Sequence, residues 1–496
     1  MTPCLLPGAN LHHLRKQARR LQRGVRAGEP DALAMLARHH PQPQAAAPGQ
    51  PLTLTGAQLV VARAYGFDSW PQLVAHLAAA APLRSDPTVH GPPGEPAADR
   101  FCRLACLTWT ADDHPDHRAA ADGLLQTGPG LVRESVFAAA AAADPVAVAH
   151  HLRADPARAT AAGGPHGWVP LLYLCASRAG AAASDERVLA TARLLLDAGA
   201  DPDAGFLWQG LVPPFTALTA AFGEGEQGPV RQPRHPHATA LARLLLRAGA
   251  DPNDGQTLYN RVFRPDDDHL VLLLEHGLGT GDGGPWRRRL GSAMPSPAQL
   301  LREQVERAVE YGYPGRVRLL AAAGADVRTP LTDGTTLAEG AARRGDDAVL
   351  SALLEGGAPA PGLDDVDRLI GAALAGDVTR VGALTRADPQ LAARARARRP
   401  DAAAAVRRPD AVPLLVRLGF DLDRAPGNRT ALHEAAMADD LPLVRALVEA
   451  GADPGVVDDE HGSTPLGWAE HTGAAAAGHF LTALVKPRRS PGDDQG

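Results

Sequence analysis

The chain has 496 residues, of which 45% are hydrophobic and only 4% aromatic, and its 50 Lys and Arg against 56 Asp and Glu give a formal charge of −6. Hydrophobicity supplied mainly by Ala and Leu favours packed helices and argues against an all-β protein, while the near-neutral balance argues against a phosphate-binding surface over the whole chain. No stretch approaches the roughly 20 apolar residues of a membrane span, and four cysteines in so long a chain do not make a disulfide scaffold.

The first segment, residues 1–83, is predicted to form a helical module. Residues 10–39 have the pattern of two short helices separated around Gly28, and residues 55–77 have that of two more, broken at Gly66. The second pair is expected to share a small core made of Leu59, Ala62, Phe67, Trp70 and Leu73. The first residues lack a positively charged segment before an apolar core, so we expect no signal peptide and a reducing cytoplasm.

The first predicted helix concentrates positive charge. Residues 1–40 contain seven Lys or Arg against two acids. Clustered arginines bind phosphates, so this helix is the candidate contact with nucleic acid or another anion, through Arg15, Arg19, Arg20 and Arg23. The alternative is an amphipathic helix that buries Leu11, Leu14, Ala18 and Leu21 and turns its arginines to solvent. No aromatic residues for base stacking lie between the basic ones.

Residues 84–100 are predicted to be a linker, and residues 101–130 a helical cap on the array that follows. The cap contains residue types that bind zinc, namely Cys102, Cys106, His114 and His117. Their spacing is C-x3-C and H-x2-H, and on a helix the two cysteines share a face that is more simply core. We therefore predict no metal site.

One phrase recurs along residues 131–485. It reads LLLDAGADPD at 194–203, LLLRAGADPN at 244–253, LLAAAGADVR at 319–328, LLVRLGFDLD at 414–423 and LVEAGADPG at 447–455. A second phrase reads TALHEAA at 430–436 and STPLGWAE at 463–470. The interval from Gly324 to Gly357 is 33 residues and that from Thr430 to Thr464 is 34. A fixed interval of this length is typical of a repeat protein.

The two phrases predict local structure. Thr464 is suited to cap a helix whose first turn contains Pro465, where no amide partner is needed. Gly451 is suited to the left-handed conformation that ends the second helix of the unit. Nine or ten repeat units are predicted, from helix pairs near 133–152, 170–198, 215–248, 257–276, 302–323, 336–356, 367–385, 401–418, 430–450 and 464–484.

This order of capped helix, turn, apolar helix, glycine stop and polar loop resembles the ankyrin repeat. The resemblance implies an all-α ankyrin-repeat solenoid with projecting β-turns or hairpin loops over residues 131–485, behind the small helical module. The module itself resembles a leader found in front of bacterial ankyrin-repeat proteins. Longer intervals require insertions near 201–240 and 279–300. The Gly- and Pro-rich stretches 223–237 and 279–297 within them read as loops, and the array is expected to break near 279–300. Residues 486–496 are expected to be a flexible tail. His433 would brace adjoining turns, as the family's histidine does.

The resemblance implies a protein-interaction scaffold that binds a partner through the concave surface of turns and helices. Candidate contact residues are Phe206, Trp208, Arg328, Asp333, Arg424, Asn428, Asp458, Asp459 and Glu460. Phe206 and Trp208 are read as exposed anchors at a loop tip, with a small satellite core as the alternative. Residues 266–269 and 458–461 combine acids with a histidine, for which solvated loop charge is the alternative.

No nucleophile with its base and orienting group, and no phosphate loop, emerges from the sequence. We therefore predict a monomer without enzyme activity, cofactor, metal or membrane contact, whose partner is an unidentified protein. The alternative is a regulatory nucleic-acid-associated protein that uses the basic N-terminal helix.

Overall fold

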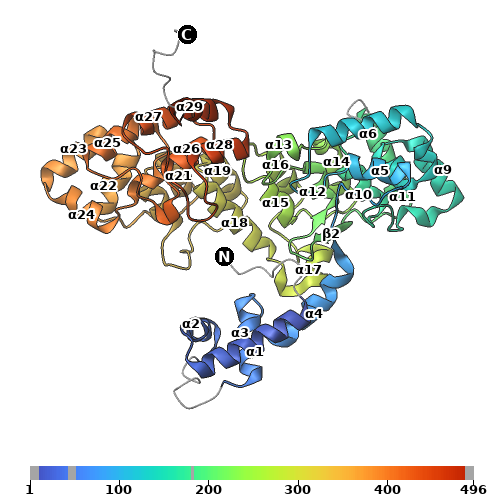
Figure 1. Ribbon diagram of the computed structural model, residues 1–496, viewed down its shortest axis with the longest axis horizontal. Helices are drawn as coiled ribbons and strands as arrows, with labels where there is room; N and C mark the ends of the chain where they lie inside the picture. Colours follow the sequence, from blue (N-terminus) through green and yellow to red (C-terminus); the bar gives the residue numbers. More distant parts are fainter. Residues whose placement is uncertain (1–9, 43–51, 180–183, 486–496) are drawn as a thin grey trace, which may run out of the picture. The chain divides into compact units, whose positions relative to one another are not determined.

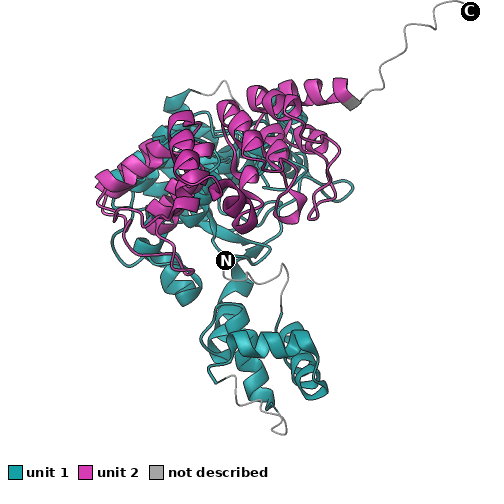
Figure 2. Cartoon of the chain, turned by 90° about the vertical axis from the view of Figure 1, so that its left-hand side faces the viewer, with its two compact units in different colours: residues 1–301 teal, residues 302–496 magenta. Residues whose placement is uncertain are grey.

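The computed structural model describes residues 10–42, 52–179 and 184–485. The chain divides into two compact units, residues 1–301 and residues 302–496 (Figures 1 and 2). Nearly all the regular elements of both units are helices, which confirms the predicted all-α repeat fold.

The first unit opens with the helical module (blue in Figure 1). Its elements are α1 (Leu11–Ala27), α2 (Pro30–His39), α3 (Leu54–Ala64), α4 (Trp70–Ala80) and the 3-10 turn η2 (Ala81–Leu83). The Asn10 side chain caps α1 and left-handed Gly28 ends it. Of the predicted small core, Ala62, Phe67 and Leu73 are buried and Trp70 packs against them, whereas Leu59 is only half-buried.

The rest of the first unit contains the cap and the first repeats. Its elements are β1 (Arg84–Ser85), α5 (Ala97–Ala105), α6 (Pro115–Thr127), α7 (Leu131–Glu134), α8 (Val136–Ala141), α9 (Pro145–Ala154), η3 (Pro156–Ala159), α10 (Pro170–Ala176), α11 (Asp185–Asp197), β2 (Gly205–Trp208), β3 (Phe215–Thr216), α12 (Ala217–Phe222), α13 (Gly228–Arg231), α14 (Ala238–Arg247), α15 (Gly255–Asn260), α16 (Asp268–Glu275), α17 (Gly284–Leu290) and η4 (Gly291–Ala293). First helices of successive repeats pack side by side, as α8, α10 and α12 do.

The second unit continues with further helix pairs. Helix α18 (Pro297–Glu310) runs through the division, and the following elements are α19 (Pro314–Ala322), α20 (Leu337–Arg343), α21 (Asp347–Glu355), α22 (Asp365–Leu374), α23 (Val378–Ala387), α24 (Leu391–Arg398), η5 (Ala402–Ala405), η6 (Pro409–Ala411), α25 (Val412–Arg417), η7 (Pro426–Asn428), α26 (Ala431–Met437), α27 (Leu441–Glu449), α28 (Pro465–Thr472) and α29 (Ala475–Val485). A continuous apolar core runs from Val366 to Leu481. All ten predicted pairs contain helices, although the pair at 401–418 begins with 3-10 turns.

The insertions are more structured than the sequence suggested. The prediction of a loop over 279–297 is wrong for residues 284–290, which form α17: Pro285 lies in its first turn, and Trp286 and Leu290, four residues apart, are buried on one face. These two side chains pack against Ala80 of α4 and Leu207 of β2. Residues 84–85, inside the predicted linker, pair in parallel with β2, and β3 pairs with β2 on its other side. The module and this insertion therefore share a core within the first unit.

Successive loops are joined by a recurring side-chain bridge. In four of the loops that follow a repeat's second helix, the side chain two positions after the loop's Asp bonds to the next loop. The Asp203 side chain accepts from the Asp251 amide at 2.8 Å, and the Asn253 side chain accepts from the Gly279 amide at 2.8 Å. The Asp423 side chain accepts from the Asp453 amide at 2.9 Å. Arg328 does the same in reverse, because its Nε donates to the Gly357 carbonyl at 3.0 Å. We call these four side chains the loop bridges, and each of them couples two neighbouring loops.

The change Asp203→Asn is expected to raise the free energy of unfolding at neutral pH. Burial first, and then neighbouring acids including Asp201 and Asp251, raise the pKa of Asp203 from 3.8 to about 6. The folded state therefore binds the Asp203 proton more tightly than the unfolded state does. The free energy of unfolding falls as pH rises from about 4 to about 6, and above pH 6 the loss is on the order of 2 kcal/mol. The amide removes that cost and keeps the acceptor, as Asn253 does one loop later. Thermal melts should show a higher Tm at about pH 7.5 and no gain at about pH 4; an equal gain at both would contradict the prediction.

A buried arginine anchors the insertion near residues 223–235 to the first unit. The Arg178 guanidinium, 5% exposed, donates to the carbonyls of Cys175, Ser177, Ala220 and Pro233 at 2.9, 2.9, 2.6 and 2.7 Å. Burial lowers the pKa of Arg178 to about 9, which still leaves it charged at neutral pH. One side chain thus joins α10, α12 and the inserted loop.

An aromatic cluster fills the same unit around His166. Its imidazole is 4.5 Å from the Trp168 ring and 5.9 Å from the stacked Tyr173 ring, measured between centroids. The Tyr173 hydroxyl accepts from the His166 amide and donates to the Gly163 carbonyl, both at 2.9 Å. Neither imidazole nitrogen of His166 has a hydrogen-bond partner among the described residues.

Candidate partner-binding surface

A half-buried tryptophan is the centre of a polar and aromatic surface in the second unit. Trp468 lies in the first turn of α28, next to α26, and the guanidinium carbon of Arg429 is 4.5 Å from its ring centroid. His461 and His471 approach the ring edge-on, with centroids 5.0 and 5.9 Å away. Arg429 also pairs with Glu434 on α26. Residues of three consecutive segments thus meet on one surface, which we call the Trp468 surface.

A buried carboxylate shapes the hairpin beside this surface. Asp458 is 2% exposed and accepts hydrogen bonds from the amides of Glu460, His461 and Ser463 at 3.0, 2.7 and 3.0 Å. It also accepts from Trp468 Nε1 at 3.0 Å. These bonds, led by that from the His461 amide, hold the pKa of Asp458 below its usual range. Asp458 therefore orients Trp468 and is not itself exposed to a partner.

The adjoining hairpin is fixed from both sides. Asn428 donates to Asp459 at 2.9 Å, and the Asp459 amide donates to the Gly427 carbonyl at 2.9 Å. His433 Nδ1 accepts from the Thr430 amide at 3.1 Å, so its protonated Nε2 faces the Ser463 carbonyl at 3.2 Å. The predicted bracing role of His433 is confirmed, as are the cap at Thr464 and the left-handed Gly451.

The predicted contact residues fall into exposed and structural groups. Arg328, Asp333, Arg424, Asn428, Asp459 and Glu460 are exposed. Of these, Arg328 is a loop bridge, and Asp333 accepts from the Thr335 amide at 2.8 Å, which lowers its pKa. The surface brings Asn428, Asp458, Asp459 and Glu460 together, whereas Arg328 and Asp333 belong to an earlier loop.

Phe206 and Trp208 do not form an exposed loop tip. Phe206 is 4% exposed and stacks between Trp168 and Phe215, at centroid distances of 4.8 and 5.6 Å. Trp208 is half-buried, and its Nε1 donates to the Thr108 carbonyl at 3.1 Å. The expectation of exposed anchors is wrong because β2 pairs on both edges and turns Phe206 inward; the satellite-core alternative describes it.

Trp468 and Arg429 were missed from the sequence. Aligning Thr430 with Thr464 puts Trp468 of the later repeat at the position of Glu434 in the earlier one. A large aromatic at an outward-facing position of a repeat was the available signal. No sequence signal indicated the contribution of Arg429, because its contact with Trp468 depends on how neighbouring repeats stack.

The arginines predicted to bind anions all lie on α1. Arg15, Arg19, Arg20 and Arg23 are exposed, while Leu14, Ala18 and Leu21 on the opposite face are buried. Leu11 is only half-buried. The amphipathic arrangement is therefore present, and the arginines are free to meet an anion.

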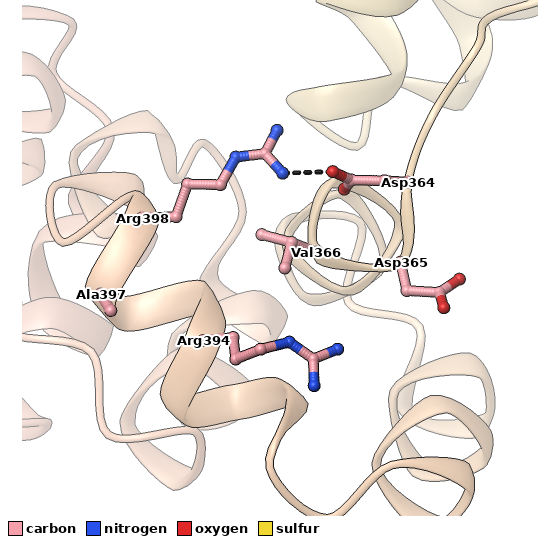
Figure 3. Close-up of a pocket in the computed structure, with 6 residues that line it drawn as sticks. All are labelled: Asp364, Asp365, Val366, Arg394, Ala397 and Arg398. Carbon is pink, nitrogen blue, oxygen red and sulfur yellow. Dashed lines mark hydrogen bonds and ion pairs between the residues drawn. The ribbon is translucent and has the colours of Figure 1, made fainter.

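A separate cavity of about 650 Å³ lies between α22 and α24 (Figure 3). Its lining residues are Asp364, Asp365, Val366, Arg394, Ala397 and Arg398. The charged groups are already paired: Arg398 with Asp364, Arg394 with Asp388 at 2.6 Å, and Asp365 with Arg368 at 2.9 Å. This pairing leaves the cavity without a set of groups directed at a small ligand.

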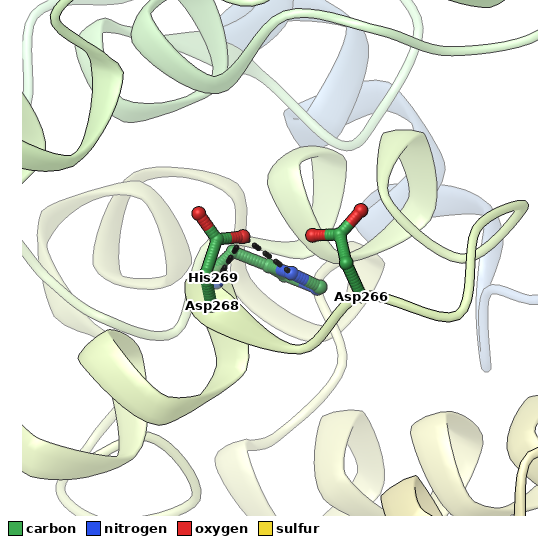
Figure 4. Close-up of side chains that lie close together, drawn as sticks. All are labelled: Asp266, Asp268 and His269. Carbon is green, nitrogen blue, oxygen red and sulfur yellow. Dashed lines mark hydrogen bonds and ion pairs between the residues drawn. The ribbon is translucent and has the colours of Figure 1, made fainter.

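Two clusters contain residue types that bind metals. Figure 4 shows Asp266, Asp268 and His269, whose ligand atoms lie within 4.8 Å of one another. The guanidinium of Arg261 contacts both carboxylates and thus supplies the positive charge that a cation would bring. In the cap, Cys102 and Cys106 are buried, and burial raises the pKa of both thiols, which favours the core interpretation over zinc thiolates. Within the described ranges, no helix has the length and apolar character needed to cross a membrane.

Comparisons with known proteins agree with this architecture. Residues 401–485, which contain the Trp468 surface, match the family model for ankyrin repeats (3 copies). No curated protein matches the chain. Among solved structures, the human ASB11 ankyrin repeat domain is similar at 21% sequence identity, covering 46% of this chain and 98% of that one with a TM-score of 0.21. That score carries no structural argument, so the assignment rests on the matched residues and on the caps, glycine stops and histidine brace described above. Ankyrin repeats are thus shown for residues 401–485, and the rest of the array has the same helix-pair architecture.

Proposed function

We propose that this chain is a non-catalytic scaffold that binds a partner protein through the Trp468 surface, as a monomer in a reducing cytoplasm. The observation that carries the proposal is the half-buried Trp468 held between Arg429 and two histidines. Tryptophan and arginine are enriched among residues that dominate binding energy, particularly where the surrounding structure fixes them in place. The bacterial origin suggested by the leader module stays a prediction.

The charge around the surface indicates the kind of partner. Residues 453–463 contain four acids and no Lys or Arg. Asp453, Asp459 and Glu460 among them are exposed. A partner segment with Lys or Arg would complement these acids, and its association rate would fall with added salt.

The test is capture of the partner by cross-linking and mass spectrometry with matched variants. Arg429→Ala and Trp468→Ala are expected to lower partner recovery more than tenfold, which corresponds to a loss above about 1.4 kcal/mol. Because Trp468→Ala also removes a hydrogen bond from the hairpin, Glu460→Lys provides a second variant that leaves the packing intact and reverses one exposed charge.

The control is a similar pair on the second helices. Arg445 on α27 lies over the Phe480 ring of α29, with 4.9 Å from its guanidinium carbon to the centroid. Arg445→Ala and Phe480→Ala should leave recovery at the wild-type level. Loss of the partner in these variants, with retention in Arg429→Ala and Glu460→Lys, would overturn the assignment. Turnover of a small molecule by a chain that binds no polypeptide would overturn the scaffold function itself.

A further inference from the structure

Helix α1 exposes a continuous row of cations. Its apolar face packs against α2 and α3, and the opposite face carries six exposed basic side chains, Arg15, Lys16, Arg19, Arg20, Arg23 and Arg26. We call these six residues the basic stripe. None of them pairs with an acid within the described ranges, and α1 itself contains no Asp or Glu. Six cations on one short helix repel each other, so the free protein gains by binding a polyanion.

The charge of the chain is divided along its length. Residues 1–83 contain eight Lys or Arg against three Asp or Glu, a net charge of +5, whereas residues 84–496 contain 42 against 53, a net of −11. The overall charge of −6 therefore conceals a cationic module. The basic stripe supplies six of the module's eight cations.

The spacing along the stripe suits a regular array of phosphates. Arg15, Arg19 and Arg23 follow one another at four-residue intervals, about 6 Å along a helix axis. From Arg15 to Arg26 the stripe is about 16 Å long, over which a duplex presents several phosphates. Five of the six cations are arginine, whose planar guanidinium binds phosphate through two hydrogen bonds.

We propose that the basic stripe binds duplex nucleic acid through its phosphates, without reading the base sequence. The glutamines of α1, which are suited to contact bases, are used inside the module: Gln17 bonds to the Tyr65 hydroxyl and Gln22 donates to the Leu52 carbonyl at 2.9 Å. The stripe has no aromatic side chain on which unpaired bases would stack, which favours a duplex over a single strand.

Two other polyanions fit less well. A lipid surface holds amphipathic helices by their apolar face, and in α1 that face is buried in the module. An acidic peptide spans about 3.3 Å per residue, so even one with an acid at every position has about half the charge per length of a duplex, which has one charge per about 1.7 Å. Both serve as competing probes in the test.

The experiment measures binding of the full chain to a short DNA duplex by fluorescence anisotropy over a salt series. Wild-type affinity is expected to fall linearly on a log–log plot, with a slope of about −4 to −5 for five or so phosphate contacts. Replacing Arg15, Arg19, Arg20 and Arg23 with Gln should reduce that slope by about 3 and weaken low-salt binding at least about tenfold. Replacing the same four with Lys should preserve the slope, which separates loss of charge from loss of fold.

The control removes equal charge elsewhere in the first unit. Arg153, Arg193, Arg243 and Arg247 are exposed on α9, α11 and α14, and their replacement with Gln should leave the slope unchanged. Equal binding by duplexes of unrelated sequence supports the proposal. Absence of duplex binding, equal loss in both Gln variants, or tighter binding to phosphatidylserine vesicles, polyglutamate or single-stranded DNA would overturn it. Partner capture by the Trp468 surface is unaffected by any of these outcomes.

Discussion

Replacing Arg178 with methionine is expected to destabilise the inserted loop by about 3 kcal/mol or more, because four buried carbonyl groups lose their donor. Methionine fills much of the space but donates no hydrogen bond. Hydrogen exchange followed by mass spectrometry should show amides of residues 219–236 exchanging roughly a hundredfold faster than in the wild-type chain. The amide of Arg178 itself bonds to the Ala105 carbonyl at 2.7 Å, so the cap should lose protection as well.

Two variants separate the guanidinium's role from general damage. Arg178→Lys keeps the charge but reaches fewer carbonyls. The exchange rate of the amides of residues 219–236 in this variant should therefore lie between the rates in the wild-type chain and in Arg178→Met. Arg193→Met removes an exposed arginine from α11 in the same unit and should exchange as the wild type does. If Arg178→Met behaved like Arg193→Met, the anchoring role would be refuted.

Acid should weaken the first unit through His166, with a total loss on the order of 4 kcal/mol. This side chain is 8% exposed, and burial first, then the Arg103 charge, lowers its pKa from 6.5 to about 3. The unfolded chain takes up a proton as pH falls below 6.5 while the folded one does not, so the stability is complete above 6.5 and is lost toward pH 3. Burial lowers the pKa of His76 and His235 too, so they add to the same trend.

The matched variant is His166→Phe, which keeps an aromatic ring between Trp168 and Tyr173 and removes the titrating group. Urea unfolding should show that the gap in stability between this variant and wild type changes by about 2.5 kcal/mol in the variant's favour from about pH 7.5 to about pH 4.5. His150→Phe, which removes an exposed imidazole from α9, should retain the wild-type pH dependence. A constant gap between His166→Phe and wild type across this range would rule out His166 as the group responsible.

The features that sequence reasoning found are local ones. Thr464, Gly451 and His433 act within their own repeat or on the next hairpin, so spacing alone was sufficient to place them. The exposed and buried faces of α1 follow equally from helical periodicity.

What sequence reasoning missed depends on pairing between distant residues. Strand β1 meets β2 about 120 positions along the chain, and this pairing turns Phe206 into the core. The sequence around Asp458 indicates a solvated acid in a loop, but in the structure three backbone amides and the Trp468 indole donate hydrogen bonds to it. Contacts of this kind depend on how loops close, which hydrophobic periodicity does not describe.

The loop bridges give the array a direction of assembly. Each bridge extends from one loop to the loop that follows it, and at Gly281 before α18 and at Gly455 before the last helix pair the corresponding position has no side chain. If a repeat were grafted after residue 485, the loop that joins it to α29 would therefore find no acceptor at position 455. Anyone lengthening this array would need to change Gly455 to Asp or Asn, whereas a repeat removed between two bridged loops would let the remaining ones rejoin without redesign.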